Sequence, residues 1–393
     1  MQNQNKITVM QLLPSLESGG VERGTIDIAK TLKNENFNPI VLSAGGILVY
    51  DLKESKINHI TVKSLKNKNP ISVFFNIKKI KKILIENHVD ILHVRSRSVM
   101  WSAYFACKNT KVKLVSTVHG AYSNNFLGIK NFYLKKIYNS IMLKSESVIA
   151  VSNYIKNYII NNFKCNHDLI NKISVIQRGV DLLYFNPDRV SKNRIIALSQ
   201  KWNLPEDKKI ILMPARFTAW KGHEFLIDAL TLVKNDFFCV MVGSDHGHKK
   251  YRKKIENTII EKNLAGKIRV VDNCRDMPAA YAISHFVVAP SIRPEAFGRI
   301  AIEAQASNKI IIATKIGGAL ETVIDTKSGY LVELGDFQSF ANIIDQVLVM
   351  DKTQVDKMGE YGRVNVDNNF SNQNMCYSTI KIYQKVIEKI NNI

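Results

Sequence analysis

The chain has 393 residues, of which 46% are hydrophobic, and Lys and Arg outnumber Asp and Glu by 55 to 34. This length exceeds one ordinary hydrophobic core, so two domains are expected. The sequence contains no apolar run of about 18 residues, which argues against a membrane-spanning helix. Five cysteines without a C-x-x-C pair, and a first segment without a secretory signal pattern, predict a reduced cytoplasmic protein.

The net charge of +21 is uneven along the chain. Residues 1–187 hold 26 basic and 11 acidic side chains, whereas the remainder holds 29 and 23. A basic first half would attract an anionic partner such as a phospholipid surface or nucleic acid. Coding bias explains the excess equally well, because Lys, Asn and Ile are all abundant.

Strand-like apolar runs alternate with helical patterns through the first half. The expected strands are 7–13, 39–44, 59–62, 90–94, 113–118, 147–152 and 172–177. Residues 71–87 repeat apolar side chains at three- and four-residue spacing, with lysines opposite, which predicts a helix. Such alternation is typical of a parallel sheet covered by helices on both faces.

Residues 179–193 interrupt this alternation with a proline and turn formers, and we interpret them as a linker. The alternation then resumes. Strands are expected at 209–215, 236–243, 267–272, 285–290 and 309–314, and helices at 222–233, 249–263 and 372–392. The prediction is an α/β protein with two doubly wound, Rossmann-like domains facing a cleft, 1–185 and 186–371. Ligands of such sheets bind at the carboxyl ends of the strands.

The stretch PEAFGRIAIEAQ places Glu295 on a loop after an expected strand and Glu303 within an expected helix. Carboxylates accept hydrogen bonds from sugar hydroxyls, so one could hold a ribose and the other a hexose. A diphosphate between these sugars would meet the backbone N–H groups of 297–300. The neighbours of Glu303 are apolar, so a buried carboxylate would need a partner; the alternative is that Glu303 faces solvent.

Arg216 and Lys221 flank the turn between a strand and a helix in LMPARFTAWKGHEF. Free N–H groups at the start of a helix, together with two cations, suit a diphosphate, although a solvated basic loop has the same composition. In the first half, Gly19 and Gly20 form a turn that either approaches a phosphate or simply reverses the chain. His119 follows a strand end and is either a functional or a structural histidine.

Several common catalytic patterns are absent from the sequence. No Asp-x-Asp pair occurs, so the usual carboxylates for a metal-bound nucleotide sugar are missing. His246 and His248 have no third ligand nearby and are interpreted as loop residues. Neither a Walker A motif nor G-x-S-x-G is present. The sequence therefore predicts no metal site and no cofactor.

These stretches together resemble glycosyltransferase family 4, whose members have the two-domain GT-B fold. Five motifs match in family order over nearly the whole chain: SGG, VHG, RFTAWKG, PSIRPEAFGRIAIEAQA and TKIGGALETV. The element from Glu295 to Glu303 is the most specific of them. The resemblance implies a hexosyltransferase that retains the anomeric configuration, needs no metal, and has a final helix, 372–393, packed back on the first domain.

The resemblance also implies roles for individual residues. Glu303 would bind the nucleotide ribose, Glu295 would lie beside the donor sugar, and residues 273–281 would hold the base. The implied catalytic residues are His119, Lys221, Arg216 and Glu295. The implied donor-binding residues are Gly19, Gly20, Arg216, Lys221, Arg275, Met277, Glu295, Phe297, Gly298, Arg299, Ile300 and Glu303. A front-face substitution is suggested, in which cations and a helix N-terminus neutralise the leaving diphosphate.

Residues 90–106 look most like the bacterial branch that builds lipopolysaccharide cores. Arg95 and Arg97 follow a strand there, so they could hold an anionic acceptor, although either could be structural.

Residues 129–144 combine lysines with aromatic and aliphatic side chains, as a helix lying on an anionic membrane would. The residues concerned are Lys130, Lys135, Lys136, Lys144, Phe132, Tyr133, Leu134, Ile137, Tyr138 and Met142. The alternative is an ordinary helix packed on the core. The predicted location is the cytoplasmic face of the inner membrane, as a peripheral protein.

Two other classes of protein fit part of the sequence. A non-hydrolysing sugar-nucleotide epimerase shares the architecture, but the paired glutamates argue against it. A basic nucleic-acid-binding protein would require stacking platforms and arginines, whereas lysine predominates here. The expected partners are therefore a nucleotide sugar, a glycan or glycolipid acceptor and an anionic membrane surface, and no nucleic acid.

Overall fold

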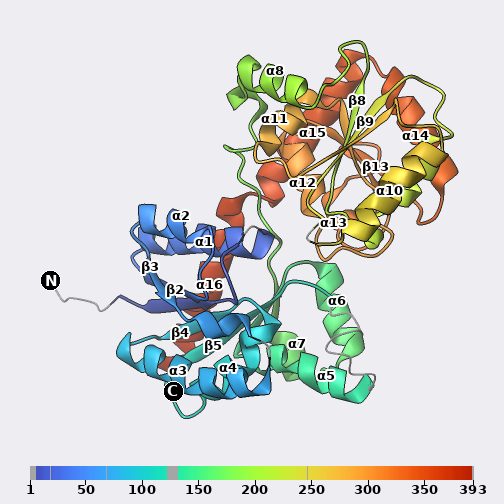
Figure 1. Ribbon diagram of the computed structural model, residues 1–393. Coiled ribbons are helices and arrows are strands. Elements are labelled where there is room, and N and C mark those ends of the chain that lie inside the picture. The colour runs from blue at the N-terminus through green and yellow to red at the C-terminus, as the bar shows by residue number, and fades with distance from the viewer. Residues whose placement is uncertain (1–5, 18, 68, 122–131, 246, 392–393) are drawn as a thin grey trace. The chain divides into compact units, whose positions relative to one another are not determined.

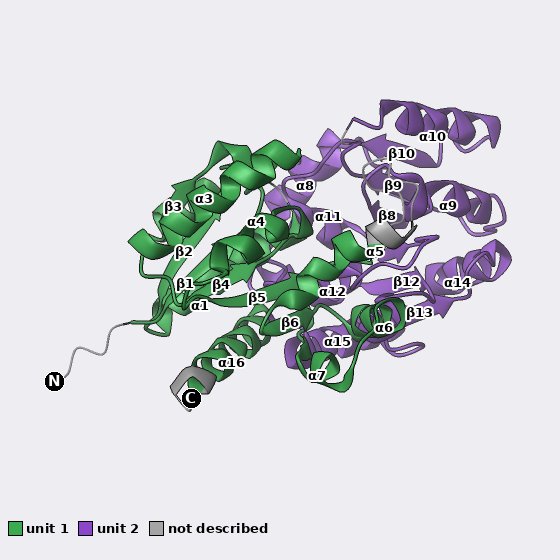
Figure 2. Cartoon of the chain, turned by 90° about the horizontal axis from the view of Figure 1, so that it is seen from below, with its two compact units in different colours: residues 1–179, 372–393 green, residues 180–371 purple. Residues whose placement is uncertain are grey.

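The computed structural model describes residues 6–17, 19–67, 69–121, 132–245 and 247–391. The chain divides into two compact units, and Figure 2 colours them separately. Unit 1 comprises Met1–Gly179 and Asn372–Ile393, and unit 2 comprises Val180–Ser371. Each unit is a parallel β-sheet covered by helices, which confirms the predicted fold class of two Rossmann-like domains.

The described part of unit 1 contains a seven-stranded sheet in the order β3-β2-β1-β4-β5-β6-β7. The strands are β1 (Thr8–Leu12), β2 (Asn38–Ser43), β3 (Asn58–Thr61), β4 (Ile91–Val94), β5 (Lys113–Val118), β6 (Ser147–Ala150) and β7 (Ile173–Val175). Every residue of β1 and β4 is buried, because helices cover both faces of the sheet. The strand order reverses between β1 and β4, which is where parallel sheets of this kind bind ligands.

Helices lie on both faces of this sheet. In Figure 1, α1 (Gly20–Asn34) and α2 (Val49–Glu54) lie over one face, and α3 (Pro70–Glu86) and α4 (Arg97–Cys107) lie over the other. The remaining helices before the second unit are α5 (Phe132–Ser140), α6 (Asn153–Asn162) and α7 (His167–Asn171). Short 3₁₀ turns occur at Lys63–Lys66 and Ile141–Lys144.

The last helix, α16 (Asn372–Asn391), packs against α1 and belongs to unit 1. Its Tyr383 hydroxyl lies 2.6 Å from Nδ1 of His93 in β4, and His93 Nε2 lies 2.7 Å from the Thr117 hydroxyl in β5. Burial lowers the pKa of His93 well below 6.5, so the ring is neutral at pH 7, with one nitrogen donating and the other accepting. This buried network fixes α16 to two central strands.

The described part of unit 2 contains a six-stranded sheet in the order β10-β9-β8-β11-β12-β13. The strands are β8 (Ile210–Pro214), β9 (Phe238–Val242), β10 (Ile268–Val271), β11 (Phe286–Ala289), β12 (Ile310–Thr314) and β13 (Gly329–Val332). The helices are α8 (Lys192–Lys201), α9 (His223–Leu230), α10 (Lys249–Glu261), α11 (Met277–Ile283), α12 (Arg299–Ala306), α13 (Ala319–Thr322), α14 (Phe337–Val349) and α15 (Lys352–Asn369). Strand order reverses between β8 and β11.

The boundary between the units lies earlier than the sequence predicted. Val180 and Phe185 are buried in the core of unit 2, and the Val180 amide donates to the Phe370 carbonyl over 2.9 Å. Residues 180–185 therefore belong to unit 2, so both the linker interpretation of 179–193 and the boundary after residue 185 are wrong. The turn-forming residues of this segment indicate a linker, although two of its side chains, Val180 and Phe185, pack in the core.

The predicted amphipathic helix over 129–144 is also partly wrong. The helix α5 ends at Ser140 and a 3₁₀ turn follows, in which Met142 is only 1% exposed. Met142 packs in the core and is unavailable to a membrane. Lys130 and the side chains of Phe132, Tyr133, Leu134 and Lys135 lie outside the described residues.

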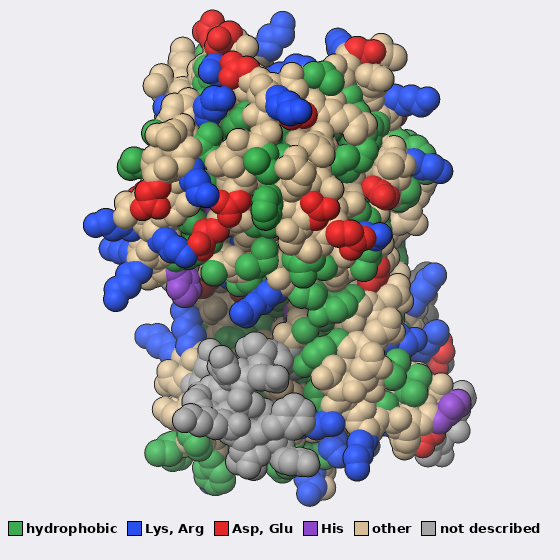
Figure 3. Space-filling model, turned by 90° about the vertical axis from the view of Figure 1, so that its right-hand side faces the viewer, with side chains coloured by type: hydrophobic (Ala, Val, Ile, Leu, Met, Phe, Trp, Pro, Cys, Tyr) green, Lys and Arg blue, Asp and Glu red, His purple; other side chains and the backbone are tan. Residues whose placement is uncertain are grey.

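No helix in the described ranges is long and apolar enough to span a bilayer. On the face shown in Figure 3, Lys and Arg side chains lie singly or in small groups rather than in one continuous patch. The charge on this face is therefore dispersed.

Candidate functional site

The candidate site of unit 2 lies at the carboxyl ends of β8 and β11, which pair directly. The loop after β8 carries Arg216 and Lys221, and the loop after β11 carries Glu295. That second loop leads into α12, which carries Glu303. Residues from separate sequence motifs are thus brought to one edge of one sheet, at its reversal of strand order.

A close backbone approach at Gly222 fixes the two loops together. Gly222 has φ +79°, and a Cβ at this position would lie 1.8 Å from the carbonyl oxygen of Pro290. The Ile292 amide donates to the Trp220 carbonyl over 2.9 Å beside it. Only glycine combines this φ with this contact, so Gly222 determines where the preceding Lys221 lies.

Lys221 forms a buried ion pair with Glu295. Its Nζ lies 2.7 Å from Glu295 Oε1, and the two side chains are only 8% and 18% exposed. The Ser291 hydroxyl donates to the same carboxylate oxygen over 2.6 Å, and the Lys221 ammonium lies 4.4 Å from the centroid of the Trp220 ring. An ammonium has three donors, so this one can donate to Glu295 and also to an anionic ligand.

Glu303 is held from two sides. Arg299 Nη2 lies 2.9 Å from its Oε1, and the Tyr281 hydroxyl donates to its Oε2 over 3.1 Å. Burial and the Glu303 charge raise the pKa of Tyr281 well above 10, so the phenol remains a donor. These two residues are the partners that a carboxylate on an apolar helix requires, and the oriented oxygens keep lone pairs for ligand hydroxyls.

Two glycines after β12 support the Glu295 loop. A Cβ at Gly317, which has φ +57°, would lie 2.6 Å from the Glu295 carbonyl oxygen. The Gly318 amide donates to that same oxygen over 2.8 Å. The motif TKIGGALETV therefore contributes to the site by positioning backbone. At the start of α12, Gly298 has φ +81° and no side chain caps the helix, so its first N–H groups lack a side-chain acceptor.

Residues 273–276 form a loop that leads into α11, and Asp276 anchors it. Asp276 accepts two hydrogen bonds from Arg194, at 2.6 and 2.8 Å, and caps α11 by accepting from the Ala279 amide at 3.2 Å. Arg194 holds the pKa of Asp276 below its usual value. Arg275 in this loop and Met277 at the start of α11 are thus tied to α8.

Three predicted donor-binding residues are placed differently from the others. Phe297 is 3% exposed and packs against Phe370 with ring centroids 5.7 Å apart, so only its backbone is available to a ligand. Ile300 is half-buried and packs against the same core. Arg216 is exposed on the loop that carries Lys221.

The predicted functional residues of unit 1 lie near the place where its strand order reverses, between β1 and β4. Arg95, Arg97 and His119 line a cavity of about 480 Å³ after β4 and β5. Gly20 begins α1, and its carbonyl accepts a hydrogen bond from Arg178.

Sequence reasoning missed several residues that shape these sites. Tyr281 lies within residues 273–281, the stretch expected to hold the base. Nothing in the sequence pairs it with Glu303, which is distant along the chain. Arg178 lies just before the expected linker, and no motif marked it as functional. Trp220 lies in the motif of Arg216 and Lys221, but the sequence indicated no role for its ring.

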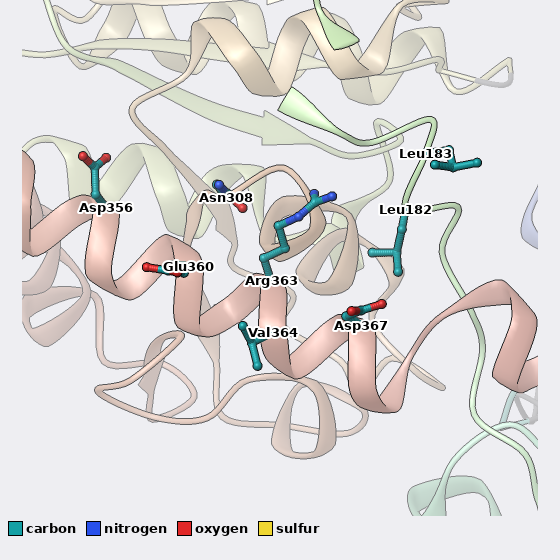
Figure 4. A pocket seen from close by; sticks show the side chains of 8 residues that line it. All are labelled: Leu182, Leu183, Asn308, Asp356, Glu360, Arg363, Val364 and Asp367. Carbon is teal, nitrogen blue, oxygen red and sulfur yellow. The ribbon is translucent and has the colours of Figure 1, made fainter. Parts of the chain in front are cut away.

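A second cavity of about 480 Å³ lies on α15 of unit 2, and Figure 4 shows its lining. It carries the carboxylates of Asp356, Glu360 and Asp367 and the guanidinium of Arg363, which donates to the Ala306 carbonyl. No predicted donor-binding residue lines this cavity, so it does not belong to the candidate site.

Comparison with known proteins agrees with this geometry. The sequence model of the family Glycosyltransferase Family 4 matches residues 18–183, and the model of the family Glycosyl transferases group 1 matches residues 195–365. A glycosyltransferase from Rickettsia africae ESF-5 is 40% identical, with a TM-score of 0.88 over 98% of this chain and 99% of that chain. The chain therefore belongs to the GT-B glycosyltransferases, and these matches favour a transferase over an epimerase.

Two more distant relatives are informative about the family. The capsular polysaccharide biosynthesis glycosyltransferase CapM of Staphylococcus aureus is 26% identical over 93% of this chain and 92% of its own length. Anabaena HepE, solved in complex with UDP-glucose, is 22% identical with a TM-score of 0.79, over 98% of this chain and all of its own. The latter similarity concerns the fold.

The buried ion pair predicts an asymmetric mutational effect. Glu295→Ala should lower the unfolding free energy of unit 2 by about 3–5 kcal/mol, because it leaves the Lys221 charge buried without its carboxylate. The double variant Lys221→Met/Glu295→Gln should recover most of this loss in urea denaturation. The control Asp228→Ala, which breaks an exposed pair with Lys262 in the same unit, should cost less than about 1 kcal/mol. Equal losses for Glu295→Ala and the control would contradict the interpretation.

Proposed function

We propose that the chain is a retaining, metal-independent hexosyltransferase that moves a sugar from a nucleotide diphosphate donor to an envelope glycan or glycolipid, such as a lipopolysaccharide core. The observation that carries the proposal is the Lys221–Glu295 pair, on the same edge of the sheet as the Arg299–Glu303 pair. The first pair supplies a cation for phosphate oxygens, and each pair supplies a carboxylate for sugar hydroxyls.

In this proposal the donor extends from Glu303, at its ribose, to Glu295, at the transferred sugar. Glu303 accepts from the ribose hydroxyls, Lys221 and Arg216 donate to the diphosphate, and Glu295 receives hydroxyls of the transferred sugar. Residues 273–281, with Arg275 and Met277, lie against the base. Because HepE binds UDP-glucose, a UDP-hexose is the first donor to test.

The proposed chemistry is a front-face substitution at the anomeric carbon. The bond from this carbon to the diphosphate oxygen breaks, and a bond to the acceptor oxygen forms on the same face. The acceptor proton passes to the departing diphosphate. Lys221 and Arg216 neutralise the charge that develops on the leaving group, the part that a divalent ion plays in metal-dependent transferases. His119 contacts the donor sugar near the reacting carbon.

The proposed acceptor is a component of the cell envelope. The relative CapM is named for capsular polysaccharide biosynthesis, and the stretch 90–106 resembles lipopolysaccharide core enzymes. Both point to a glycan or glycolipid acceptor on the cytoplasmic face of the inner membrane.

Helix α3 offers a surface for that membrane. Ile71, Phe74 and Phe75 are 70%, 58% and 56% exposed, although large apolar side chains are usually buried. Lys78 and Lys82 continue the same exposed stripe, and the Lys78 ammonium lies 5.9 Å from the centroid of the Phe74 ring. An apolar end followed by lysines suits an anionic bilayer. Within 129–144, Ile137 is also 59% exposed.

The donor-site proposal predicts the kinetics of Lys221→Ala. Turnover should fall by roughly a hundredfold or more, which is the scale of losing one donor to developing negative charge. The measurement is the initial rate of sugar transfer from a UDP-hexose to an envelope glycolipid extract. The control Lys253→Ala, an exposed lysine on α10, should retain the wild-type rate. Near-normal turnover of Lys221→Ala would reject the assigned role.

The membrane proposal is tested by co-sedimentation with vesicles. The wild-type protein should bind vesicles rich in phosphatidylglycerol and not neutral ones. Phe74→Ser/Phe75→Ser should bind about tenfold more weakly, because two apolar side chains no longer enter the bilayer. The control Phe337→Ser/Val349→Ser alters exposed apolar side chains of unit 2, which are 46% and 66% exposed, and should bind normally. Equal binding to neutral vesicles, or none to either, would refute the membrane surface.

A further inference from the structure

The cavity of unit 1 has an unusual balance of charge. It lies at the carboxyl ends of β1, β4 and β5, and its volume is about 480 Å³. Three basic side chains, Lys66, Arg95 and Arg97, line it, against one lining carboxylate, Glu22. Lys66 also pairs with Glu17 over 3.1 Å, so the two arginines carry most of the positive excess. A concave site with this excess of positive charge concentrates anions.

Arg95 is the most deeply buried of these cations. Its side chain is 2% exposed, and Nη1 donates to Gln11 Oε1 over 3.2 Å. Gln11 is itself fixed, because its amide donates to the Thr25 carbonyl over 2.9 Å. The Nε of Arg95 is buried and has no hydrogen-bond partner within the described part of the chain. A buried guanidinium normally has its donors satisfied, so this wall of the cavity holds an N–H that an anion could use.

The N-terminus of α4 lies at the same wall. This eleven-residue helix begins at Arg97, and the side chain of its N-cap, Ser96, makes no capping hydrogen bond. The Ser96 hydroxyl lies 3.1 Å from the Ser98 hydroxyl instead, and both serines line the cavity. The first N–H groups of the helix therefore lack a side-chain acceptor, and the helix end favours negative charge.

Two further groups lie near Arg95, the guanidinium of Arg178 and the ring of His119. A Cβ on Gly24 of α1 would lie 3.3 Å from nitrogens of both Arg95 and Arg178, so two guanidiniums lie over the first turns of that helix. His119 also lines the cavity, and its buried Nε2 has no hydrogen-bond partner among the residues that the structure describes. Burial, with the charges of Arg178 and Arg95, lowers the pKa of His119 well below 6.5, so its ring is neutral at pH 7.

We propose that this cavity binds an anionic group, a phosphate or a carboxylate, of the acceptor. The inference rests on the proposed function and names the acceptor class as a phosphorylated or uronic-acid-bearing glycan. The anion accepts from Arg95 Nε and from the first N–H groups of α4, while Glu22 accepts from a neighbouring hydroxyl. Arg97 acts at the edge, because its guanidinium donates to Asn139 and lies 5.4 Å from the centroid of the Tyr138 ring.

A substitution at Ser98 tests the cavity without weakening the fold. Ser98→Asp places a carboxylate in the first turn of α4, where it stabilises the helix and competes with an incoming anion. The matched control is Ser72→Asp, in the first turn of α3. Inorganic phosphate and UDP are titrated by calorimetry at constant ionic strength into the wild type, both serine variants and Lys221→Ala.

The expected pattern separates this cavity from the donor site. Phosphate should bind the wild type, Ser72→Asp and Lys221→Ala alike, and Ser98→Asp at least about tenfold more weakly, as expected for the loss of one charge-assisted interaction. UDP affinity should fall in Lys221→Ala and remain within twofold in Ser98→Asp. In transfer assays, phosphate should inhibit competitively against the acceptor and not against the donor.

Other results overturn the proposal. No phosphate binding to the wild type, or binding unaffected by Ser98→Asp, removes the anion site. Loss of phosphate binding in Lys221→Ala would place it in unit 2, and equal weakening of UDP in Ser98→Asp would assign the cavity to the donor diphosphate. Failure of the proposed transferase function is distinct, because it would abolish UDP binding to the wild type while the phosphate titration still reported on the cavity.

Discussion

The close approach of Gly222 to the Pro290 carbonyl is the constraint on which the site of unit 2 depends. It brings the loop after β8 against the loop after β11 and leaves Lys221 within 2.7 Å of Glu295 in a nearly buried position. A charge pair in such a place is costly unless its groups are fully bonded. In the proposed function, a ligand diphosphate accepts the hydrogen bonds that Lys221 can still donate, so the ion pair and donor binding would depend on the same ammonium.

Both units have a reversal of strand order at the candidate site, but the side chains there differ in charge. In each, strand order reverses beside the first strand, and loops from two neighbouring strands meet there. Unit 2 fills this place with alternating carboxylates and cations, which suits a ligand that carries both hydroxyls and phosphates. The cavity of unit 1 is lined by two guanidiniums, one lysine, one neutral imidazole and one carboxylate. This difference in charge is the basis for proposing that unit 2 binds the nucleotide sugar and unit 1 binds an anionic group of the acceptor.

The sequence predicted the strands other than β13 (Gly329–Val332) because their apolar runs are bounded by turn residues. It also predicted that Lys221, Glu295 and Glu303 lie together, because motifs that follow neighbouring parallel strands meet at one sheet edge. The sequence-based prediction failed where a side chain is buried although the local sequence pattern indicates an exposed turn or a helix end. Phe185 lies in a turn-rich segment yet packs in a core, and Met142 follows a helix end and is buried. The pairing of Tyr281 with Glu303, and of Arg178 with Gly20, depends on contacts between distant segments, which composition and spacing do not encode.

The central proposal is that Glu303, Lys221 and Arg216 hold a nucleotide diphosphate without a divalent metal ion. Thermal unfolding with UDP in the presence of EDTA tests it most directly. The account predicts a higher melting temperature at saturating UDP, since a ligand at 100 times its Kd stabilises the native state by about 2.7 kcal/mol, and no change when EDTA replaces divalent ions. A melting temperature unaffected by UDP, or raised only when a divalent ion is added, would contradict it.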